Sequence, residues 1–309
     1  MVTLKLLRYG RDLGPYVRKF VEYAMEVLGA EVTFYSFEEG GLDFVELGED
    51  EYYSAEAERT CATLTFEPPS VEVNRLEVEG ALVQQEEGEG GGGGGALEEI
   101  EVVLVDAQSV EYSSWLDFYT SRVGEEGGRV GVIILPDRIP SLEEVHHYKK
   151  LLWNLQRGFT LSLSFTRELK ETLPGGLLLT ILTLTTPGVV NIDAADMEYF
   201  CRGGLTLLPL TAFAEGEGDL PSRIMREVVL GYRGAVDFRS VKGAVVNVFT
   251  TEEVPLKDVM RVVEGVRRLL PKSARIITGI NLERGERRMG LLLLAGLIPN
   301  ELLMHLYAT

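Results

Sequence analysis

Strand-like and helix-like apolar patterns alternate along the first half of the chain. From Val17 to Leu28, apolar side chains recur three or four positions apart, which predicts a helix over 14–30 with one buried face. Further helices are predicted at about 110–123, 141–156 and 167–184. Short apolar runs predict strands at 2–7, 31–37, 61–68, 100–107, 129–136 and 159–165, and the rest of 40–98 has no clear pattern. This alternation indicates a doubly wound, mainly parallel sheet.

Beyond residue 193 the order of the predicted elements changes. The pattern gives helices at 194–203, 220–231 and 255–270, and strands at 204–213, 243–250, 274–281 and 287–297. The last two strands have no helix between them, which indicates a mixed sheet. We therefore expect an α/β domain, a connecting helix and a smaller α/β domain. The sheet of the smaller domain, within 194–297, should carry three helices and be separate from the first sheet.

The charge of the chain excludes several classes of partner. Lys and Arg number 30 against 48 Asp and Glu, a net charge of −18. Such a surface repels nucleic-acid phosphates and anionic lipids, so we expect neither as a partner. The longest apolar runs fall short of the roughly 20 residues that span a membrane, and residues 1–10 lack a signal-peptide pattern. We expect a cytoplasmic protein without membrane insertion.

The residues that bind metals are too few and too scattered to predict a metal site. Cys61 and Cys201 are far apart in the sequence, which is typical of two reduced thiols. His146 and His147 are adjacent in a predicted helix, so they point in different directions. Neither H-x-x-x-H nor C-x-x-C occurs, and G-x-S-x-G is missing as well, so zinc and serine-nucleophile mechanisms have no support.

The stretch "GVVNIDAAD", residues 188–196, gathers an amide and two carboxylates: Asn191, Asp193 and Asp196. Asp193 is well placed to be the N-cap of the helix predicted from residue 194, with Asp196 in its first turn at the positive end of the helix dipole. Each of these roles contributes roughly 0.5–2 kcal/mol and requires no catalytic function. From these residues alone, a helix cap and half of an active site both remain open.

The second half of the chain resembles the FtsZ family of the tubulin superfamily. The segment "PGVVNIDAADMEYFCRGGLTLLPLTAF" is similar to the family's loop and helix G-L-I-N-x-D-x-A-D-V and the strand that follows, and 242–297 is similar to its C-terminal domain. The resemblance runs from about residue 129 to 297. It implies an α/β, tubulin/FtsZ-like two-domain fold: a Rossmann-like GTPase-type domain at 1–166, a central connecting helix at 167–186, and a C-terminal domain with a mixed sheet at 187–309.

The same resemblance implies a chemical role for the loop. In FtsZ, subunits stack head to tail, and the loop's Asn and two Asp enter the nucleotide pocket of the next subunit. Asn191, Asp193 and Asp196 would then orient and polarise the water that attacks a neighbour's γ-phosphate, because phosphoryl transfer depends on positioning and on an acceptor for water. The partner would be a second copy of this chain or a conventional FtsZ subunit, meaning one with complete phosphate loops. We expect both carboxylates to be exposed, and Asp196→Ala to change the melting temperature little.

The nucleotide-binding half departs from the family pattern. The first loop, G-x-G-G-x-G-x-N in FtsZ, is "RYGRDLGPY" here and keeps only Gly10 and Gly14. After the strand that ends at Asp106, the phosphate loop G-G-G-T-G-T/S-G is replaced by "AQSVEYSSW", which has no glycine. Without glycine, side chains occupy the space that phosphates need. Thr166 stands where the family has the Asn that contacts guanine.

Six consecutive glycines, including Gly90, Gly91 and Gly92, precede that strand and leave an alternative open. They lack the spacing and the Lys of a P-loop and are typical of a flexible linker, although FtsZ has a further Gly-rich phosphate loop at this place. We therefore expect a regulator or cap of a conventional filament, with GTP or GDP bound weakly and Mg²⁺ only if GTP binds. The alternatives are a GTPase that polymerises and uses 88–95 to bind GTP, and a scaffold or small-molecule binding protein that keeps only the fold.

Overall fold

A computed structural model of the chain describes residues 1–9, 14–37, 44–49, 59–67, 99–107, 128–135, 142–158, 161–165 and 167–307. The strands are β1 (Val2–Tyr9), β2 (Glu31–Phe37), β3 (Phe44–Leu47), β4 (Arg59–Phe66), β5 (Glu99–Asp106), β6 (Gly128–Ile134), β7 (Leu161–Phe165), β8 (Thr206–Glu215), β9 (Gly243–Thr251), β10 (Arg275–Glu283) and β11 (Arg288–Leu297). The helices are α1 (Gly14–Leu28), α4 (Leu142–Gly158), α5 (Leu173–Thr185), α6 (Ala194–Arg202), α7 (Leu220–Gly231), α8 (Leu256–Leu269) and α9 (Pro299–Tyr307), with 3-10 turns η2 (Arg167–Thr172) and η3 (Phe238–Ser240).

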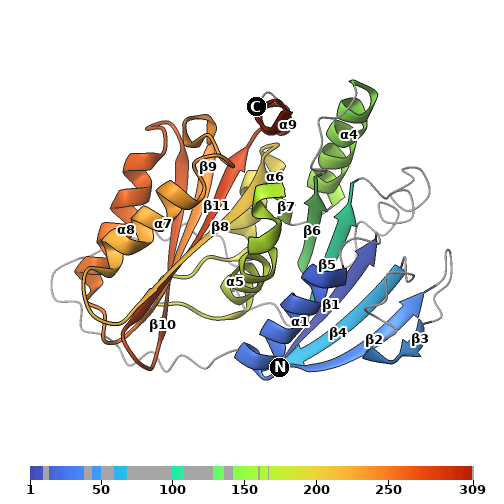
Figure 1. Cartoon of the computed structure of the whole chain (residues 1–309), viewed down its shortest axis with the longest axis horizontal. Helices are drawn as coiled ribbons and strands as arrows, with labels where there is room; N and C mark the ends of the chain where they lie inside the picture. Colours follow the sequence, from blue (N-terminus) through green and yellow to red (C-terminus); the bar gives the residue numbers. More distant parts are fainter. Residues whose placement is uncertain are drawn as a thin grey trace, which may run out of the picture.

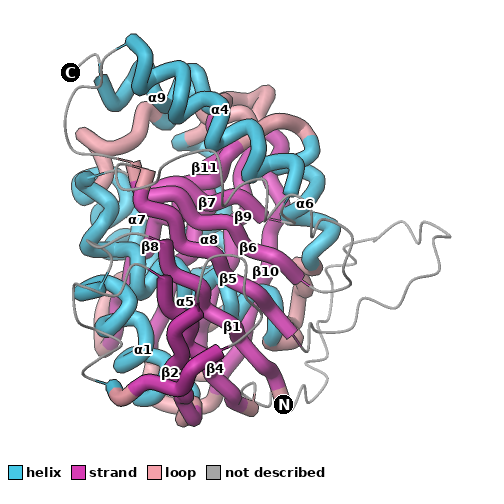
Figure 2. The backbone as a smooth tube through the Cα atoms, turned by 90° about the vertical axis from the view of Figure 1, so that its right-hand side faces the viewer, coloured by secondary structure: helices cyan, strands magenta, loops and turns pink. Residues whose placement is uncertain are grey.

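The strands form one sheet of 11 strands in the order β10-β9-β11-β8-β7-β6-β5-β1-β4-β2-β3 (Figure 1). The run from β8 through β7, β6 and β5 to β1 is parallel. In the tube view of Figure 2, α1 and α7 lie on one side of the strands and α6 on the other. The predicted α/β class with a parallel central sheet is therefore confirmed.

The expectation of two separate sheets is wrong, because hydrogen bonding continues from β7 into β8. The contact is narrow: a single pair, Leu163 and Leu207, is in register. Apolar side chains of β7 and β8 are buried in one hydrophobic core, which the two halves of the molecule share. The domain boundaries at 166 and 187 stay a prediction.

Beyond that pair, side chains of α7 bond to the edge of β8 in place of a strand. The Tyr232 hydroxyl, just after α7, donates to Thr211 O (2.7 Å) and accepts from Thr211 N–H (2.9 Å). Glu227 accepts from Phe213 N–H (3.2 Å), and Arg223 donates to Glu215 O (2.7 Å). An open sheet edge carries backbone groups that need partners. Here Arg223 and Glu227 of α7, together with Tyr232 just after it, supply them at every second residue of β8.

The N-terminal edge of the sheet differs from a doubly wound arrangement. β4 lies between β1 and β2 and is antiparallel to both, and β3 extends the antiparallel edge. The strand 61–68 and the strand 31–37 were both predicted, but the insertion of one beside the other was not. The predicted helix 110–123 lies outside the described residues, and α9 was not predicted.

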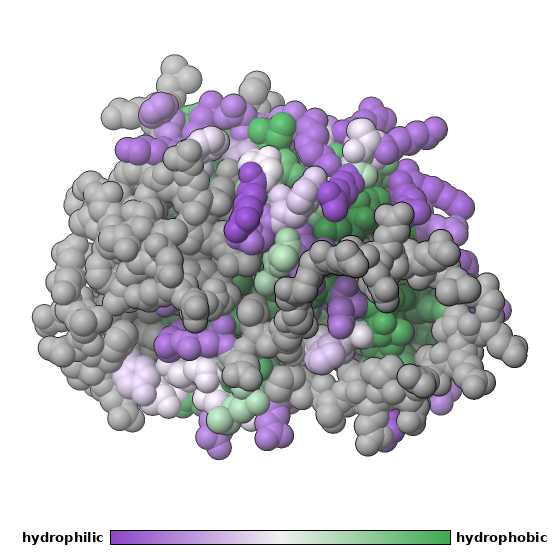
Figure 3. Space-filling view, turned by 180° about the vertical axis from the view of Figure 1, so that it is seen from behind, coloured by the Kyte–Doolittle hydropathy of each residue, from purple (hydrophilic) through white to green (hydrophobic). Residues whose placement is uncertain are grey.

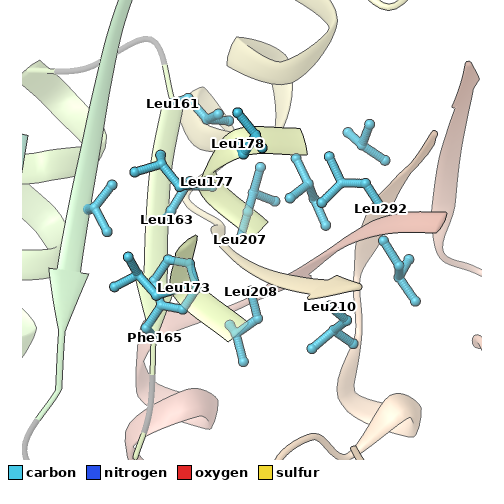
Figure 4. Close-up of a cluster of buried hydrophobic side chains, with 14 of the residues drawn as sticks. Leu161, Leu163, Phe165, Leu173, Leu177, Leu178, Leu207, Leu208, Leu210 and Leu292 are labelled. Atoms are coloured by element: carbon cyan, nitrogen blue, oxygen red, sulfur yellow. The ribbon is translucent and has the colours of Figure 1, made fainter. Parts of the chain in front are cut away.

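The central helix lies in the core where the two halves meet. Residues 167–184 were predicted as one helix, yet the first turns form η2 and the α-helix begins at Leu173. Pro174 explains the break, because proline lacks an N–H and fits an α-helix only in its first turn. Leucines of α5 pack there with side chains of β7, β8 and β11 (Figure 4). The labelled set is Leu161, Leu163, Phe165, Leu173, Leu177, Leu178, Leu207, Leu208, Leu210 and Leu292.

The C-terminal half follows the predicted order closely. β9 and β10 are parallel and are joined by α8, whereas β11 inserts between β9 and β8 antiparallel to each. Helices α7 and α8 pack together, α7 on β8 and α8 on β9. A mixed sheet with three helices between residues 194 and 297 is therefore confirmed.

Hydrophilic side chains gather along one rim of the surface (Figure 3). The described side chains along the upper rim of the face in Figure 3 are mostly hydrophilic. Within the described ranges, no helix is long and apolar enough to cross a membrane.

Removing the Tyr232 hydroxyl tests how β8 is held beyond Leu207. We expect Tyr232→Phe to lower the free energy of unfolding by about 1–2 kcal/mol, because the N–H and C=O of Thr211 lose their partner. Urea unfolding measures this, with Tyr199→Phe as the control, since the Tyr199 ring is half exposed. Equal stability of Tyr232→Phe and the wild type would show that water replaces the hydroxyl at this edge.

Candidate functional site: the 188–196 loop

The loop that contains the three candidate residues lies along the outer edge of β10, the last strand of the sheet. Val189 N–H and Val190 N–H donate to Ile280 O (2.8 and 3.4 Å), and Ile280 N–H donates to Val190 O (3.0 Å). This is an isolated antiparallel bridge. Hydrogen bonds to β10 thus fix the position of the loop between α5 and α6.

Two glycines allow the loop to approach so closely. A Cβ atom on Gly188 would lie 2.5 Å from Ile280 O, and one on Gly279 would lie 2.5 Å from the Ile192 side chain. Contacts this short do not occur, so any larger residue would push the loop away from the strand. Gly188 N–H also donates to the Asn191 side-chain oxygen, which closes the turn. Asn191 is therefore exposed and shapes the loop, and its catalytic role stays a prediction.

A buried pair of asparagines positions the start of the loop. Asn281 on β10 donates to Thr186 O (3.2 Å), and Asn247 on β9 donates to Asn281 Oδ1 (2.8 Å) and to Thr183 Oγ1 on α5 (2.7 Å). The exposed fraction is 1% for Asn247 and 5% for Asn281. Buried side-chain amides need hydrogen-bond partners, and here these bonds connect β9, β10 and the end of α5. Neither was predicted from the sequence, although an isolated Asn within "VVNVF" and "GINLE" is a visible signal.

Asp193 and Asp196 form a reciprocal cap at the start of α6. Asp196 N–H donates to Asp193 Oδ1 (2.8 Å), and Asp193 N–H donates to Asp196 Oδ2 (3.2 Å). The predicted N-cap at Asp193 is therefore confirmed, and Asp196 has a second role that was not predicted. Asp193 is exposed, as expected, whereas Asp196 is half-buried. Because Asp196 accepts from a backbone N–H, its replacement by Ala removes one of the two reciprocal bonds of the cap.

The charge state of Asp196 reflects its partial burial. Burial raises the pKa of this carboxyl above its usual range, and the nearby Asp193 carboxylate raises it further. The bond from Asp193 N–H and the positive charge of Arg275 act in the opposite direction. Arg275, the first residue of β10, thus belongs to the surroundings of the loop, and sequence analysis did not identify it.

Most of the predicted nucleotide-binding residues lie outside the described residues. These are Gly10, Gly90, Gly91, Gly92 and Thr166. Gly14 is described and begins α1. At the place of the phosphate loop, β5 ends at Asp106, and Ala107 N–H donates to Ile134 O (3.0 Å). The N–H of Ala107, the first residue after β5, is thus bonded within the sheet, and residues 108–127 that follow it lie outside the described residues.

Replacing Asp196 separates its hydrogen bond from its charge. We expect Asp196→Ala to lower the free energy of unfolding by about 1 kcal/mol at pH 7, because the cap loses the acceptor for Asp193 N–H. Asp196→Asn keeps an acceptor and should cost less. Since the folded-state pKa is raised, ionisation of Asp196 opposes folding as the pH rises above about 4. The stability of Asp196→Asn relative to the wild type should therefore improve between pH 3 and 7 in thermal melts; an unchanged difference would contradict this.

Comparison with known proteins gives two sequence matches. No family model matches the chain. It is 26% identical over 103 residues to cell division protein FtsZ 2 of Methanocaldococcus jannaschii, covering 33% of this chain and 27% of that protein. It is 31% identical over 104 residues to cell division protein FtsZ of Haloferax mediterranei, covering 32% of this chain and 26% of that protein. The matched stretches thus span about a quarter of these relatives.

Among solved structures, a mutant FtsZ of Methanocaldococcus jannaschii aligns at 13% identity over 67% of this chain and 85% of that chain, with a TM-score of 0.48. CetZ from Methanosaeta thermophila aligns at 15% identity over 68% and 65%, with a TM-score of 0.48. TubZ of Bacillus thuringiensis serovar israelensis, in GDP-form protofilaments, aligns at 11% identity over 67% and 66%, with a TM-score of 0.46. The two sequence matches, each over about a third of this chain, support its assignment as a divergent member of the tubulin/FtsZ superfamily.

Proposed function

We propose that this chain is an FtsZ-like cytoskeletal protein that regulates or caps a conventional FtsZ filament. It docks its 188–196 loop head to tail on the nucleotide-bearing end of the next subunit. The chain itself binds GTP weakly or not at all. The two relatives matched by sequence are both named cell division protein FtsZ, which supports this general role.

The observation that carries the proposal is the fixed, exposed loop. Asn191 and Asp193 are exposed on a turn that β10 holds by backbone hydrogen bonds. A catalytic group must be held in place before the reaction, since positioning supplies much of the rate in phosphoryl transfer. In the proposed assembly, Asp193 and Asp196 accept hydrogen bonds from the water that attacks the neighbour's γ-phosphate. Asn191 keeps the turn in shape.

The charge of Asp196 suits this role. A carboxylate accepts hydrogen bonds from water in its ionised form, and burial raises the pKa of Asp196 above the usual range of an Asp carboxyl. A raised pKa makes a carboxylate a better hydrogen-bond acceptor. Docking on an anionic phosphate would raise the pKa further.

A complementation experiment tests the proposal. A conventional FtsZ in which both aspartates of its own loop are replaced by Ala supplies the nucleotide pocket but no catalytic loop. Adding this chain should restore GTP hydrolysis, because the missing carboxylates then arrive from the added subunit. Asp196→Asn should restore at least about tenfold less, since it preserves the fold and removes the charged acceptor. Released phosphate is the measurement.

The matched control is Asp237→Ala, which removes a cap of the same kind away from the loop, where Asp237 accepts from Arg239 N–H (3.0 Å). It should restore hydrolysis as the wild type does. If the wild-type chain restores nothing and does not sediment with FtsZ polymers, the chain does not act at a filament end.

GTP binding by the isolated chain is a separate prediction. We expect a Kd for GTP weaker than micromolar, because "AQSVEYSSW" offers no glycine to phosphate and Ala107 N–H is engaged with Ile134 O. Calorimetry with GTP and Mg²⁺ measures the affinity. Stoichiometric GDP or GTP in the purified protein would favour a GTPase that uses residues 88–95 instead.

A further inference from the structure

A guanidinium group lies beside the carboxylates of the loop. The Arg275 guanidinium carbon is 3.9 Å from the centre of the Tyr199 ring, well within the range of a cation–π contact. Tyr199 and Asp196 are three residues apart on α6 and share one face of that helix. Arg275 therefore sits next to Asp196, in agreement with its effect on the pKa of that carboxyl.

The surrounding structure holds Arg275 in this position. Its backbone N–H donates to Lys242 O (3.3 Å) at the start of β10. The Tyr199 ring packs edge-on against Phe200, with 5.6 Å between the centroids, and Phe200 is buried against Gly243. The stacked guanidinium thus rests on a ring that the core anchors, and little side-chain freedom remains to be lost when it binds a ligand.

Both members of the stack face solvent. The Tyr199 side chain is 51% exposed and Arg275 is exposed. By contrast, Arg202 at the end of α6 pairs with Glu198 at 2.6 Å. No carboxylate among the described residues lies within ion-pair distance of Arg275, so its N–H donors remain directed to solvent on the face that presents Asp193 and Asp196.

The proposed docking creates an electrostatic problem that such a cation solves. Two carboxylates that approach the phosphates of a nucleoside triphosphate are repelled by them, and the chain has a net charge of −18. A guanidinium beside the carboxylates offsets the repulsion, and its fork of donors fits phosphate oxygens. We propose that Arg275, held on Tyr199 beside Asp196, contacts the phosphate oxygens of the nucleotide on the neighbouring subunit and stabilises the charge that develops there.

This inference rests on the proposed function, and the complementation assay can separate the two. With the loop-deficient FtsZ and GTP, we expect Arg275→Gln to lower the restored hydrolysis by at least about tenfold. Arg275→Lys should give an intermediate rate, because it keeps the charge but loses the planar fork. The matched control is Arg202→Gln, which removes an exposed guanidinium at the opposite end of α6 from Asp196 and should restore GTP hydrolysis as the wild type does.

Chemical rescue distinguishes a contact with phosphate from a structural role. Millimolar guanidinium ion should raise the rate of Arg275→Ala severalfold and leave that of Asp196→Ala unchanged, while both variants still sediment with FtsZ and melt as folded proteins. If Arg275→Gln hydrolyses GTP within about twofold of the wild type while Asp196→Asn does not, the inference is wrong and the proposed function stands. If Arg275→Ala loses stability and is not rescued, the stack serves only to hold α6. If no form of the chain restores hydrolysis or sediments with FtsZ polymers, the proposed function fails.

Discussion

The short bridge between the loop and Ile280 is the interaction on which the candidate site depends. β10 is the last strand of its sheet, so the backbone groups along its outer edge need partners. Val189 and Val190 supply them at one residue, and Gly188 makes the approach possible because it has no Cβ. The same contact that covers a sheet edge therefore places Asn191, Asp193 and the start of α6 at the surface. The same hydrogen bonds therefore satisfy the edge of β10 and hold the loop at the surface.

A second constraint concerns how the two halves of the molecule share a core. The sheet passes from β7 to β8 through one residue pair, and α5 lies against that junction with almost all of its side chains buried. Beyond the pair, side chains of and just after α7 take the place of a neighbouring strand along β8. The loop leaves the end of α5, and Asn247 and Asn281 tie that end to β9 and β10. A shift of α5 would therefore displace the loop.

Much of the fold could be predicted from the sequence because the periodic apolar patterns are local. The C-terminal helices and strands lie where the spacing placed them, and Asp193 could be recognised as a cap from its position alone. Strand neighbours could not be predicted in the same way. β4 alternates buried and half-buried residues whichever strand it pairs with, so its insertion beside β1 depends on distant contacts. Pro174 is a local signal that the α-helix begins after η2, but the continuous apolar pattern of 167–184 predicted a single helix.

The site was predicted in part, for the same physical reason. The three polar residues of the loop are contiguous and therefore visible in the sequence. Arg275 is about 80 residues away and joins them only because β10 begins beside α6.

The central claim is that the loop completes a nucleotide site on another subunit. A cryo-EM structure of this chain bound to the end of a GTP-loaded FtsZ filament tests it most directly. We expect Asp193, Asp196 and Arg275 to face the γ-phosphate of the neighbour; a complex formed through another surface, with the loop facing solvent, would contradict the claim.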